Sequence, residues 1–406
     1  MNYSKILSLF FRAVTILGRF LLTYLITKKI SLELQGEFTL ISTTISLLVL
    51  LLGFDFYVFS TRKISINKEE PIFVFKNQFV IHTIVFFTFA LVFLLCMFFL
   101  KLPLTFTHFL FIIAILFFEH LGQELFRLYL ILEKVLLANI LLFFKSGIWA
   151  LLIAGYIFFF DINIISIGSI LLTWLFFSII SVVFGLFYFP KINTFFKIKI
   201  DKIWIKNGVK VGLYLFMSTV ALKIVEYSDR YLISYFLNIK DLGIYSFYFQ
   251  LYNLFNVAMF TLVISFVFPK IFNAAGEDDF LRINKYKKEI LRSTFLFCIL
   301  YILIFYFSIE FLLDSIGKVE LYKYQNIFYL LLFGGLFMNM SYAYHYILMA
   351  KNKDKIIIIT NILTAALNVL LNLFFIPLFG IVGAAISFFG SAVILFCLKL
   401  YFYKKT

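Results

Sequence analysis

The chain has 406 residues, of which 63% are hydrophobic and only 14% are charged. Soluble domains average about 45–50% apolar and about 25% charged residues, so a water-soluble fold of this size cannot hide so much apolar surface. The composition therefore predicts an all-α integral membrane protein in a lipid bilayer and excludes a soluble enzyme. The net charge of +15 lies in short blocks between long apolar runs, which is typical of basic loops and argues against nucleic acid as a partner.

Twelve apolar runs are long enough for spanning helices, which need about 20 mostly apolar residues. The first six cover residues 6–27, 38–60, 79–100, 104–125, 136–158 and 164–187. The second six cover residues 209–236, 245–268, 293–314, 325–349, 355–376 and 380–402. The first run contains Arg12 and Arg19 and continues to Thr27, which favours a retained helix over a cleaved signal peptide. Spans three and four nearly touch at Lys101-Leu102-Pro103, which predicts a tight hairpin.

Lys and Arg are unevenly distributed among the connecting loops. With the N-terminus in the cytoplasm, the cytoplasmic segments hold about 25 of these residues and the opposite loops about 6. Because cytoplasmic loops are enriched in Lys and Arg, we expect both termini on the cytoplasmic side. The two most basic segments are residues 190–210 and 269–292.

The segment at 190–210 divides the chain into two halves that resemble each other. RFLLTY in span one (19–24) is echoed by RYLISY in span seven (230–235), and each is followed by a short polar loop with a glycine. Asn139-Ile140-Leu141 opens span five, and Asn361-Ile362-Leu363 opens span eleven. Equivalent spans match in the same order, which predicts a parallel duplication. We expect an N-terminal six-helix lobe (1–190), a basic cytoplasmic linker (191–208) and a C-terminal six-helix lobe (209–406).

Ionisable residues inside spans cost about 2.5–3.5 kcal/mol each on insertion scales, so they are expected to face the protein interior. Arg12 and Arg19 are seven residues apart, which places them within about 20° on one helix face. This spacing predicts a cationic wall along a polar cavity, with snorkelling of Arg12 to the headgroups as the alternative. Lys145 stands in the apolar run of span five, and Glu119 of span four has no cation on its own helix nearby. Glu119 can pair with Lys145, pair elsewhere or be protonated.

Span seven carries Lys223, Glu226, Asp229 and Arg230 within two turns of helix. Glu226 can reach Lys223 at i,i+3 and Arg230 at i,i+4, and Asp229 lies between them in the sequence. One interpretation is a self-neutralising ladder on one helix, and the other is a substrate or coupling-ion site built on that ladder.

The remaining polar residues indicate structural roles. His82 and His108 lie near span ends, which indicates interfacial positions, and His345 stands among tyrosines, which favours hydrogen-bonded packing. Asn368 and Asn372, one turn apart, are suited to hydrogen bonds between helices. We find no convincing metal-ligand spacing, no nucleotide-binding loop and no nucleophile motif, so we expect no metal, no cofactor and no catalytic residue.

Several segments resemble one known family. They are residues 368–385 (NVLLNLFFIPLFGIVGAA), 229–233 (DRYLI), 242–246 (LGIYS) and 35–38 (QGEF). The chain is similar in these motifs, in length and in its twelve spans to the Wzx-type O-antigen and capsule flippases. These belong to the MATE-like multidrug/oligosaccharidyl-lipid/polysaccharide (MOP) exporter superfamily. The resemblance implies two pseudo-symmetric six-helix lobes around a central cavity that opens alternately to each side of a bacterial inner membrane.

The resemblance also implies a substrate, an oligosaccharide on a polyprenyl diphosphate, and work alongside a polysaccharide polymerase and glycosyltransferases. A diphosphate requires cations in a low-dielectric cavity. The candidate substrate-binding cations are Arg12, Arg19, Lys145, Lys223 and Arg230, and the candidate ion-coupling acids are Glu119, Glu226 and Asp229. Three alternatives stay open: a drug or metabolite antiporter, a lipid-linked peptidoglycan-precursor flippase, and a membrane-embedded glycosyltransferase or polymerase. The short outer loops argue against the last of these.

Overall fold

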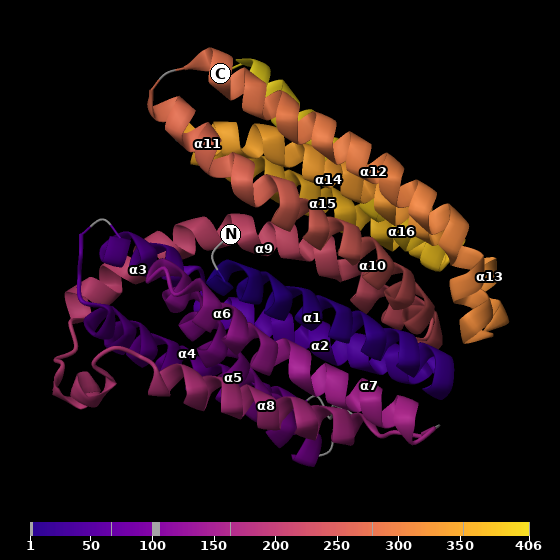
Figure 1. Cartoon of the computed structure of the whole chain (residues 1–406), viewed down its shortest axis with the longest axis horizontal. Helices are drawn as coiled ribbons and strands as arrows, with labels where there is room; N and C mark the ends of the chain where they lie inside the picture. The colour runs from indigo at the N-terminus through magenta and orange to yellow at the C-terminus, as the bar shows by residue number, and fades with distance from the viewer. Residues whose placement is uncertain are drawn as a thin grey trace. The chain divides into compact units, whose positions relative to one another are not determined.

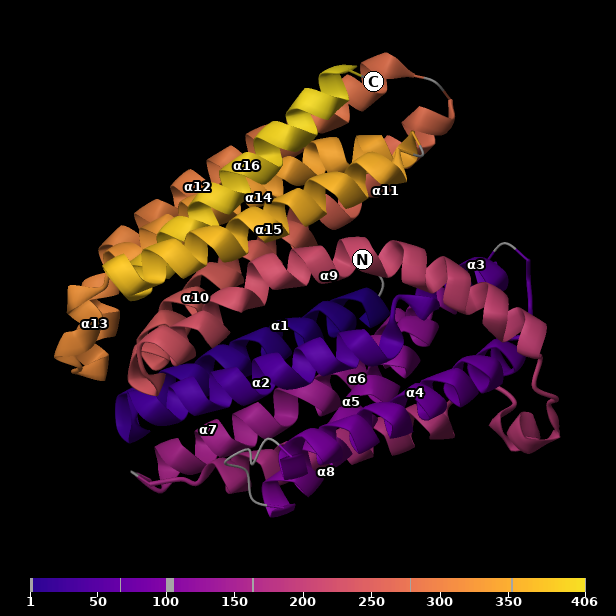
Figure 2. The same cartoon turned by 180° about the vertical axis from the view of Figure 1, so that it is seen from behind.

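The computed structural model describes residues 3–65, 67–99, 106–162, 164–277, 279–351 and 353–405, and no strand occurs among them. The chain divides into two compact units. Unit 1 comprises Met1–Leu25 and Ile41–Phe216, and unit 2 comprises Ile26–Leu40 and Met217–Thr406. Figures 1 and 2 show the helices of both units from opposite sides.

Unit 1 is a bundle built around α5. Its elements are α1 (Tyr3–Leu25), most of α2 (Leu32–Gly53), α3 (Phe56–Ser65), α4 (Pro71–Phe99), α5 (Phe106–Ile131), α6 (Val135–Leu142), the π-helical turn η2 (Phe143–Ile148), α7 (Trp149–Phe159), α8 (Ile167–Phe187), the 3-10 turn η3 (Ile192–Lys197) and the start of α9 (Lys202–Phe236). Helix α5 packs against α6 and α8, and α1 packs against α6, η2 and α7.

Unit 2 is a bundle built around α14. Its elements are the π-helical turn η1 (Ile26–Ile30), the start of α2, the rest of α9, α10 (Ile239–Met259), η4 (Phe260–Ile264), α11 (Ser265–Gly276), α12 (Phe280–Ile316), α13 (Val319–Lys323), α14 (Asn326–Ala350), α15 (Asp354–Phe379) and α16 (Ile381–Lys405). Helix α14 packs against α10, α12 and α16, and α15 packs against α16.

Twelve helical stretches among the described residues are long and apolar enough to cross a membrane. The predicted all-α, twelve-span architecture is therefore confirmed. Many large apolar side chains on these helices are exposed, which is the pattern expected of surfaces that face lipid. The chain is a multi-pass membrane protein.

Local sequence explains where several helices begin and end. The side chains of Ser166, Asn238 and Asp279 cap α8, α10 and α12 by accepting hydrogen bonds from backbone N–H groups at the third residue beyond each cap. Helix α12 ends at Gly317, whose φ of +72° is easily adopted by glycine. Pro71 begins α4, where its missing N–H costs no helical hydrogen bond.

Several predicted boundaries differ from the structure. Span two was expected to reach residue 60, but α2 ends at Gly53 because Phe54 and Asp55 adopt left-handed backbone conformations, with φ of 31° and 54°. The basic segment 269–292 was expected to be a loop, yet it lies mainly on α11 and α12. Helix α12 has 37 residues and is therefore about 55 Å long, more than the roughly 30 Å of a hydrocarbon core.

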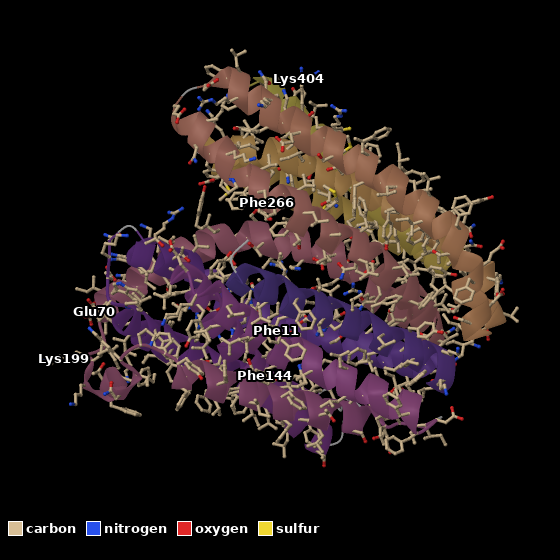
Figure 3. All side chains as sticks on the ribbon, viewed as in Figure 1. Phe11, Glu70, Phe144, Lys199, Phe266 and Lys404 are labelled. Carbon is tan, nitrogen blue, oxygen red and sulfur yellow. The ribbon has the colours of Figure 1, made fainter. Side chains whose placement is uncertain are left out.

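Two features expected from the sequence cannot be compared with the structure, because they lie outside the residues and side chains that it describes. The hairpin expected at Lys101-Leu102-Pro103 is one, and the side chain of His108 is the other. In unit 1, Figure 3 shows Glu70 and Lys199 projecting outward, and both side chains are exposed.

Equivalent contacts in the two units support the predicted parallel duplication. In unit 1, Asn139 of α6 donates a hydrogen bond to Ser8 of α1 over 2.7 Å. In unit 2, Asn361 of α15 donates one to Ser218 of α9 over 2.8 Å. These asparagines open spans five and eleven, and their partners stand in spans one and seven. The same residue type therefore joins the same pair of spans in both halves.

Candidate functional site

A buried ion pair lies at the centre of unit 1. The Nζ atom of Lys145 is 3.0 Å from an Oε atom of Glu119, and both side chains are about nine-tenths buried. Lys145 also donates a hydrogen bond to Gln123 over 3.0 Å. The second Oε atom of Glu119 accepts hydrogen bonds from Trp174 (2.7 Å) and Ser178 (3.0 Å) of α8. The pairing of Glu119 with Lys145, one of three options from the sequence, is the one the structure contains.

Two stacked tryptophans connect this ion pair to Arg19. The rings of Trp149 and Trp174 are 5.3 Å apart and nearly parallel, at 16°. Trp149 donates a hydrogen bond to the Lys145 carbonyl over 3.0 Å, and the guanidinium carbon of Arg19 lies 6.0 Å from its ring centroid. A guanidinium near a tryptophan ring is attracted by the negative face of the ring. Arg19, Glu119 and Lys145 thus belong to one polar and aromatic network in unit 1.

The helical geometry around Lys145 is irregular. Lys145 lies within the π-helical turn η2, and such turns are frequent at functional sites. Close packing surrounds the turn: a Cβ atom added to Gly147 would be 2.9 Å from the hydroxyl of Thr15 in α1, and one added to Gly122 would be 3.1 Å from the Lys145 side chain. Small residues on α5 and η2 therefore allow α1 and Lys145 to approach.

The two arginines of α1 differ in environment. Arg19 is exposed, whereas Arg12, seven residues earlier, is partly buried. Both are proposed members of a substrate site.

Helix α9 of unit 2 holds the second group of predicted site residues. Lys223 forms an ion pair with Glu226 over 2.6 Å, as expected for the ladder, and these side chains are about one-third exposed. The guanidinium of Arg230 lies over the rings of Tyr227 and Phe249, at 4.7 and 4.4 Å. Arg230 is buried in this aromatic setting.

Asp229 is almost fully buried between α9 and α10. Its carboxylate accepts hydrogen bonds from the phenol of Tyr245 and from the backbone N–H of Arg230. The structure thus groups Arg19, Glu119 and Lys145 in unit 1, and Lys223, Glu226, Asp229 and Arg230 in unit 2. A single cavity that collects residues of both groups stays a prediction.

Cross-helix hydrogen bonds expected for the asparagines are present. Asn368 donates to Ser391 of α16 over 3.0 Å and accepts from Ser228 of α9 over 2.9 Å. Asn372 donates to Asn368 over 3.1 Å. These contacts join α9, α15 and α16, which is consistent with a structural role.

Lys399 of α16 is a buried cation that the sequence alone did not single out. Its side chain is only 1% exposed, and its Nζ atom lies 3.3 Å from Nδ1 of His345 in α14. This contact agrees with the hydrogen-bonded packing expected for His345. Lys399 lies at the end of an apolar helix close to Lys404 and Lys405, so the sequence did not indicate that its side chain faces the interior of unit 2.

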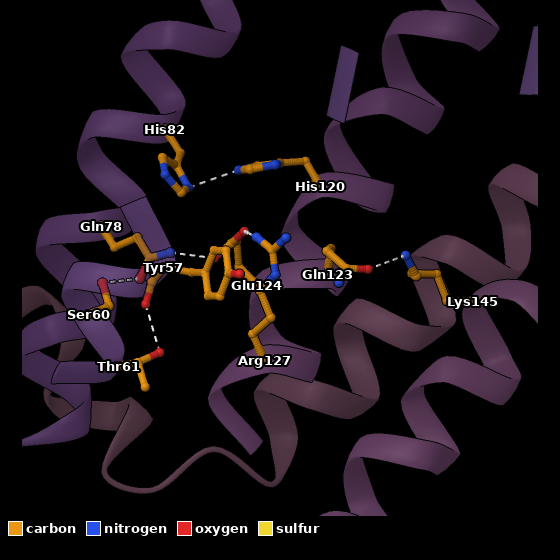
Figure 4. Close-up of polar contacts among 10 residues, drawn as sticks. All are labelled: Tyr57, Ser60, Thr61, Gln78, His82, His120, Gln123, Glu124, Arg127 and Lys145. Atoms are coloured by element: carbon orange, nitrogen blue, oxygen red, sulfur yellow. Dashed lines mark hydrogen bonds and ion pairs between the residues drawn. The ribbon is translucent and has the colours of Figure 1, made fainter. Parts of the chain in front are cut away.

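The expected interfacial position of His82 is wrong. The side chain is 5% exposed, and its Nδ1 atom is 2.8 Å from Nε2 of His120, as Figure 4 shows. Glu124, one turn after His120, accepts hydrogen bonds from Gln78 and from Arg127, the latter over 2.6 Å. A position near a span end does not reveal which face of the helix a side chain occupies, so the sequence could not place His82 inside.

Comparison with known proteins identifies the family. Residues 6–275 match the model of a family described as polysaccharide biosynthesis protein. The chain belongs to the polysaccharide biosynthesis protein family. No curated protein has a sequence that matches this member of the family significantly.

Solved structures show the same fold as this family member at low sequence identity. An inward-facing multidrug resistance MATE transporter of the MOP superfamily is 12% identical, with a TM-score of 0.68 over 96% of this chain and 94% of that one. The lipid II flippase MurJ is 14% identical, with a TM-score of 0.68 over 99% and 87%. The Vibrio cholerae MATE transporter VcmN is 15% identical, with a TM-score of 0.61 over 100% and 98%. The predicted MATE-like fold is confirmed.

Proposed function

We propose that this chain is a flippase that moves an oligosaccharide linked to a polyprenyl diphosphate from the inner to the outer leaflet of a bacterial cytoplasmic membrane. The observation that carries the proposal is the match to the polysaccharide biosynthesis family, on a fold shared with transporters and a lipid flippase. O-antigen or capsule repeat units are the proposed cargo. Alternating access of the two halves is the proposed mechanism, and a polysaccharide polymerase and glycosyltransferases are the proposed partners.

The cations of unit 1 support an anionic headgroup as the recognised part of the cargo. Arg19 is exposed on α1, and guanidinium groups bind phosphate oxygens in a bidentate manner. Arg12 is proposed to act with Arg19. Lys145 already pairs with Glu119, so its proposed contribution to the diphosphate requires Glu119 to be protonated or displaced. That exchange would link substrate binding to an acid, which is the proposed ion-coupling role of Glu119.

Unit 2 supplies the corresponding residues by sequence equivalence. Arg230 matches Arg19 in the duplicated motif, and Lys223 precedes it by seven residues as Arg12 precedes Arg19. We propose that Lys223 and Arg230 contact the diphosphate at a later stage of the cycle. Glu226 and Asp229, which neighbour these cations, are the proposed coupling acids of this half.

A drug or metabolite antiporter and a lipid-linked peptidoglycan-precursor flippase are the alternatives. The equal TM-scores to a MATE transporter and to MurJ mean that the fold does not choose between them. The substrate must therefore be determined by measurement.

The test uses cells that lack this gene and carry plasmid copies of equal expression. Without the protein, lipid-linked oligosaccharide should accumulate and surface glycan should disappear, and the wild-type copy should restore both. Arg19→Gln should abolish the restoration and Arg19→Lys should retain part of it, because Lys keeps the charge but not the bidentate geometry. Lys404→Gln, on the exposed end of α16, is the matched control.

Two outcomes would contradict the proposal. If surface glycan is unchanged when the gene is removed, the cargo is not a lipid-linked glycan. If Arg12→Gln, Arg19→Gln and Lys145→Gln export normally, singly and combined, these cations do not form the substrate site.

A further inference from the structure

Three side chains of α4 and α5 converge in the interior of unit 1. His82 stands on α4, while His120 and Glu124 stand one turn apart on the same face of α5. One ligand atom from each residue lies within 4.8 Å of the other two, and all three side chains are buried. Among the described residues, this is the one group of His, Cys, Asp or Glu side chains with such a geometry.

A small cavity lies at the meeting point of these side chains. It has a volume of about 20 Å³, and its polar lining comes from Gln78, His82, Thr83, His120 and Glu124. A cavity needs roughly 10–15 Å³ to admit one water molecule, so this one has room for a single small ion or water. The apolar part of its wall is formed by Leu121 and by phenylalanines 75, 79, 86 and 117.

The histidines retain binding capacity at this cavity. The Nε2 atom of His82 is buried and has no hydrogen-bond partner in the part of the chain that the structure describes. Buried polar atoms usually have partners, so the contact between the two rings leaves the hydrogen-bonding needs of His82 only partly met. The mutual contact of the two rings places Nδ1 of His82 and Nε2 of His120 2.8 Å apart, close enough for both to bind one ion after small ring rotations.

We propose that His82, His120 and Glu124 bind one first-row divalent transition-metal ion of the zinc class. Two imidazole nitrogens and one carboxylate oxygen are a ligand set that zinc accepts, with the fourth position open. Sodium, magnesium and calcium prefer oxygen ligands, so two histidines argue against them. The inference concerns a second site and goes beyond the proposed flippase activity.

Arg127 and Gln78 already contact the Glu124 carboxylate, so a metal ion would compete with them for it. Arg127 forms an ion pair with one carboxylate oxygen of Glu124 over 2.6 Å, and its guanidinium packs on the ring of Tyr57 at 3.9 Å. Gln78 donates a hydrogen bond to the other carboxylate oxygen of Glu124. The amide oxygen of Gln78 in turn accepts a hydrogen bond from Ser60 over 2.8 Å. The side chain of Arg127 is 24% exposed, so it can move outward when the metal takes the carboxylate. Gln78 would stay and orient Glu124, as outer-shell partners of metal ligands do.

The experiment uses the full-length purified protein in detergent, after removal of its affinity tag and treatment with a chelator. Zinc binding is measured by calorimetry and by metal analysis after gel filtration, and cobalt is used as an optical probe. We expect one zinc per chain and a visible cobalt spectrum of tetrahedral nitrogen and oxygen ligation. His82→Gln and His120→Gln should lower zinc affinity by roughly 100-fold or more, since each removes a direct ligand, whereas outer-shell changes cost 10–100-fold.

Two further variants separate metal ligation from folding. His345→Gln removes a half-buried histidine of unit 2 outside the cluster and should leave zinc binding unchanged. Arg127→Gln should raise zinc affinity, because it removes the cation that competes for Glu124. If either histidine variant fails to fold, zinc X-ray absorption of the wild-type protein decides the question, and two imidazoles are expected around the metal. Wild-type protein that binds no zinc, or binds it without imidazole ligands, would overturn the proposal.

Discussion

The ion pair of Glu119 and Lys145 shows how single residues hold charge inside this membrane protein. Each partner has more than one contact, because Glu119 also accepts from Trp174 and Ser178, and Lys145 also donates to Gln123. A buried charge that loses its partner is costly, whereas a well-packed apolar replacement of both partners is often neutral. Removal of one partner is therefore expected to lower the free energy of unfolding more than apolar replacement of both partners.

The corresponding prediction compares single and double substitutions. Lys145→Met or Glu119→Leu alone should destabilise the protein by about 3–5 kcal/mol, because each leaves a buried charge uncompensated. The double variant should be more stable than either single variant. Thermal unfolding in detergent measures the difference, with Lys223→Met as a control from the more exposed pair on α9. Additive effects of the two substitutions would show that the residues act independently.

At the residue scale, the sequence predicted which charges lie within spans but only some of their partners. Glu119 and Lys145 were possible partners because both stood alone in apolar runs, yet helical spacing alone does not fix the rotation of two helices. His82 and His120 are 38 residues apart and Lys399 and His345 are 54 apart, so only the packing of separate helices brings each pair together.

At the scale of elements, two glycines allow the helices that follow the repeated motifs to pack closely. Gly36 follows span one and Gly243 follows span seven, and both lie in unit 2. A Cβ atom added to Gly36 would be 2.0 Å from the carbonyl oxygen of Ile239, and one added to Gly243 would be 1.9 Å from that of Leu32. The beginnings of α2 and α10, which follow the two repeated motifs, thus pack backbone against backbone. Neither contact leaves room for any side chain.

Alanine substitutions test this backbone contact. Gly36→Ala and Gly243→Ala should each destabilise the protein by about 1–3 kcal/mol or more, because backbone atoms must shift to admit the new methyl group. Gly155→Ala, on α7 with no atom closer than 3.9 Å to the added Cβ, should be neutral or slightly stabilising, since alanine favours helix. The unfolding temperatures of the three variants in detergent provide the comparison. Normal stability of both Gly36→Ala and Gly243→Ala would rule out the close contact.

The elements themselves were more predictable than their ends. Hydropathy locates the apolar windows, so the number and order of spans could be predicted. Helices such as α9 and α12, however, extend past their apolar windows into the basic segments. The break after α2 could not be predicted, because a bulky residue such as Phe54 rarely adopts a left-handed conformation. The repeated asparagines were visible in the sequence, whereas their serine partners were not.

At the scale of the whole molecule, the distribution of Lys and Arg makes a prediction about orientation. Both termini and the segment at 190–210 should lie in the cytoplasm, because the basic residues gather in alternate connections. Reporter fusions after Lys210 and after Thr406 should both give cytoplasmic signals. A fusion after Lys240, in the opposite set of connections, is the control and should report the other side. A non-cytoplasmic signal from either of the first two fusions would contradict the twelve-span topology.

The most direct test of the proposed function is translocation by the purified protein. Full-length protein is reconstituted into vesicles that contain a lipid-linked oligosaccharide, and sodium or proton gradients are imposed in turn. A glycosidase that cannot cross the membrane then reports how much glycan is accessible. The account predicts that the wild-type protein makes the glycan of the inner leaflet accessible and that the folded Arg12→Gln, Arg19→Gln double variant does not. Inner-leaflet glycan that stays protected with folded wild-type protein under every gradient would contradict it.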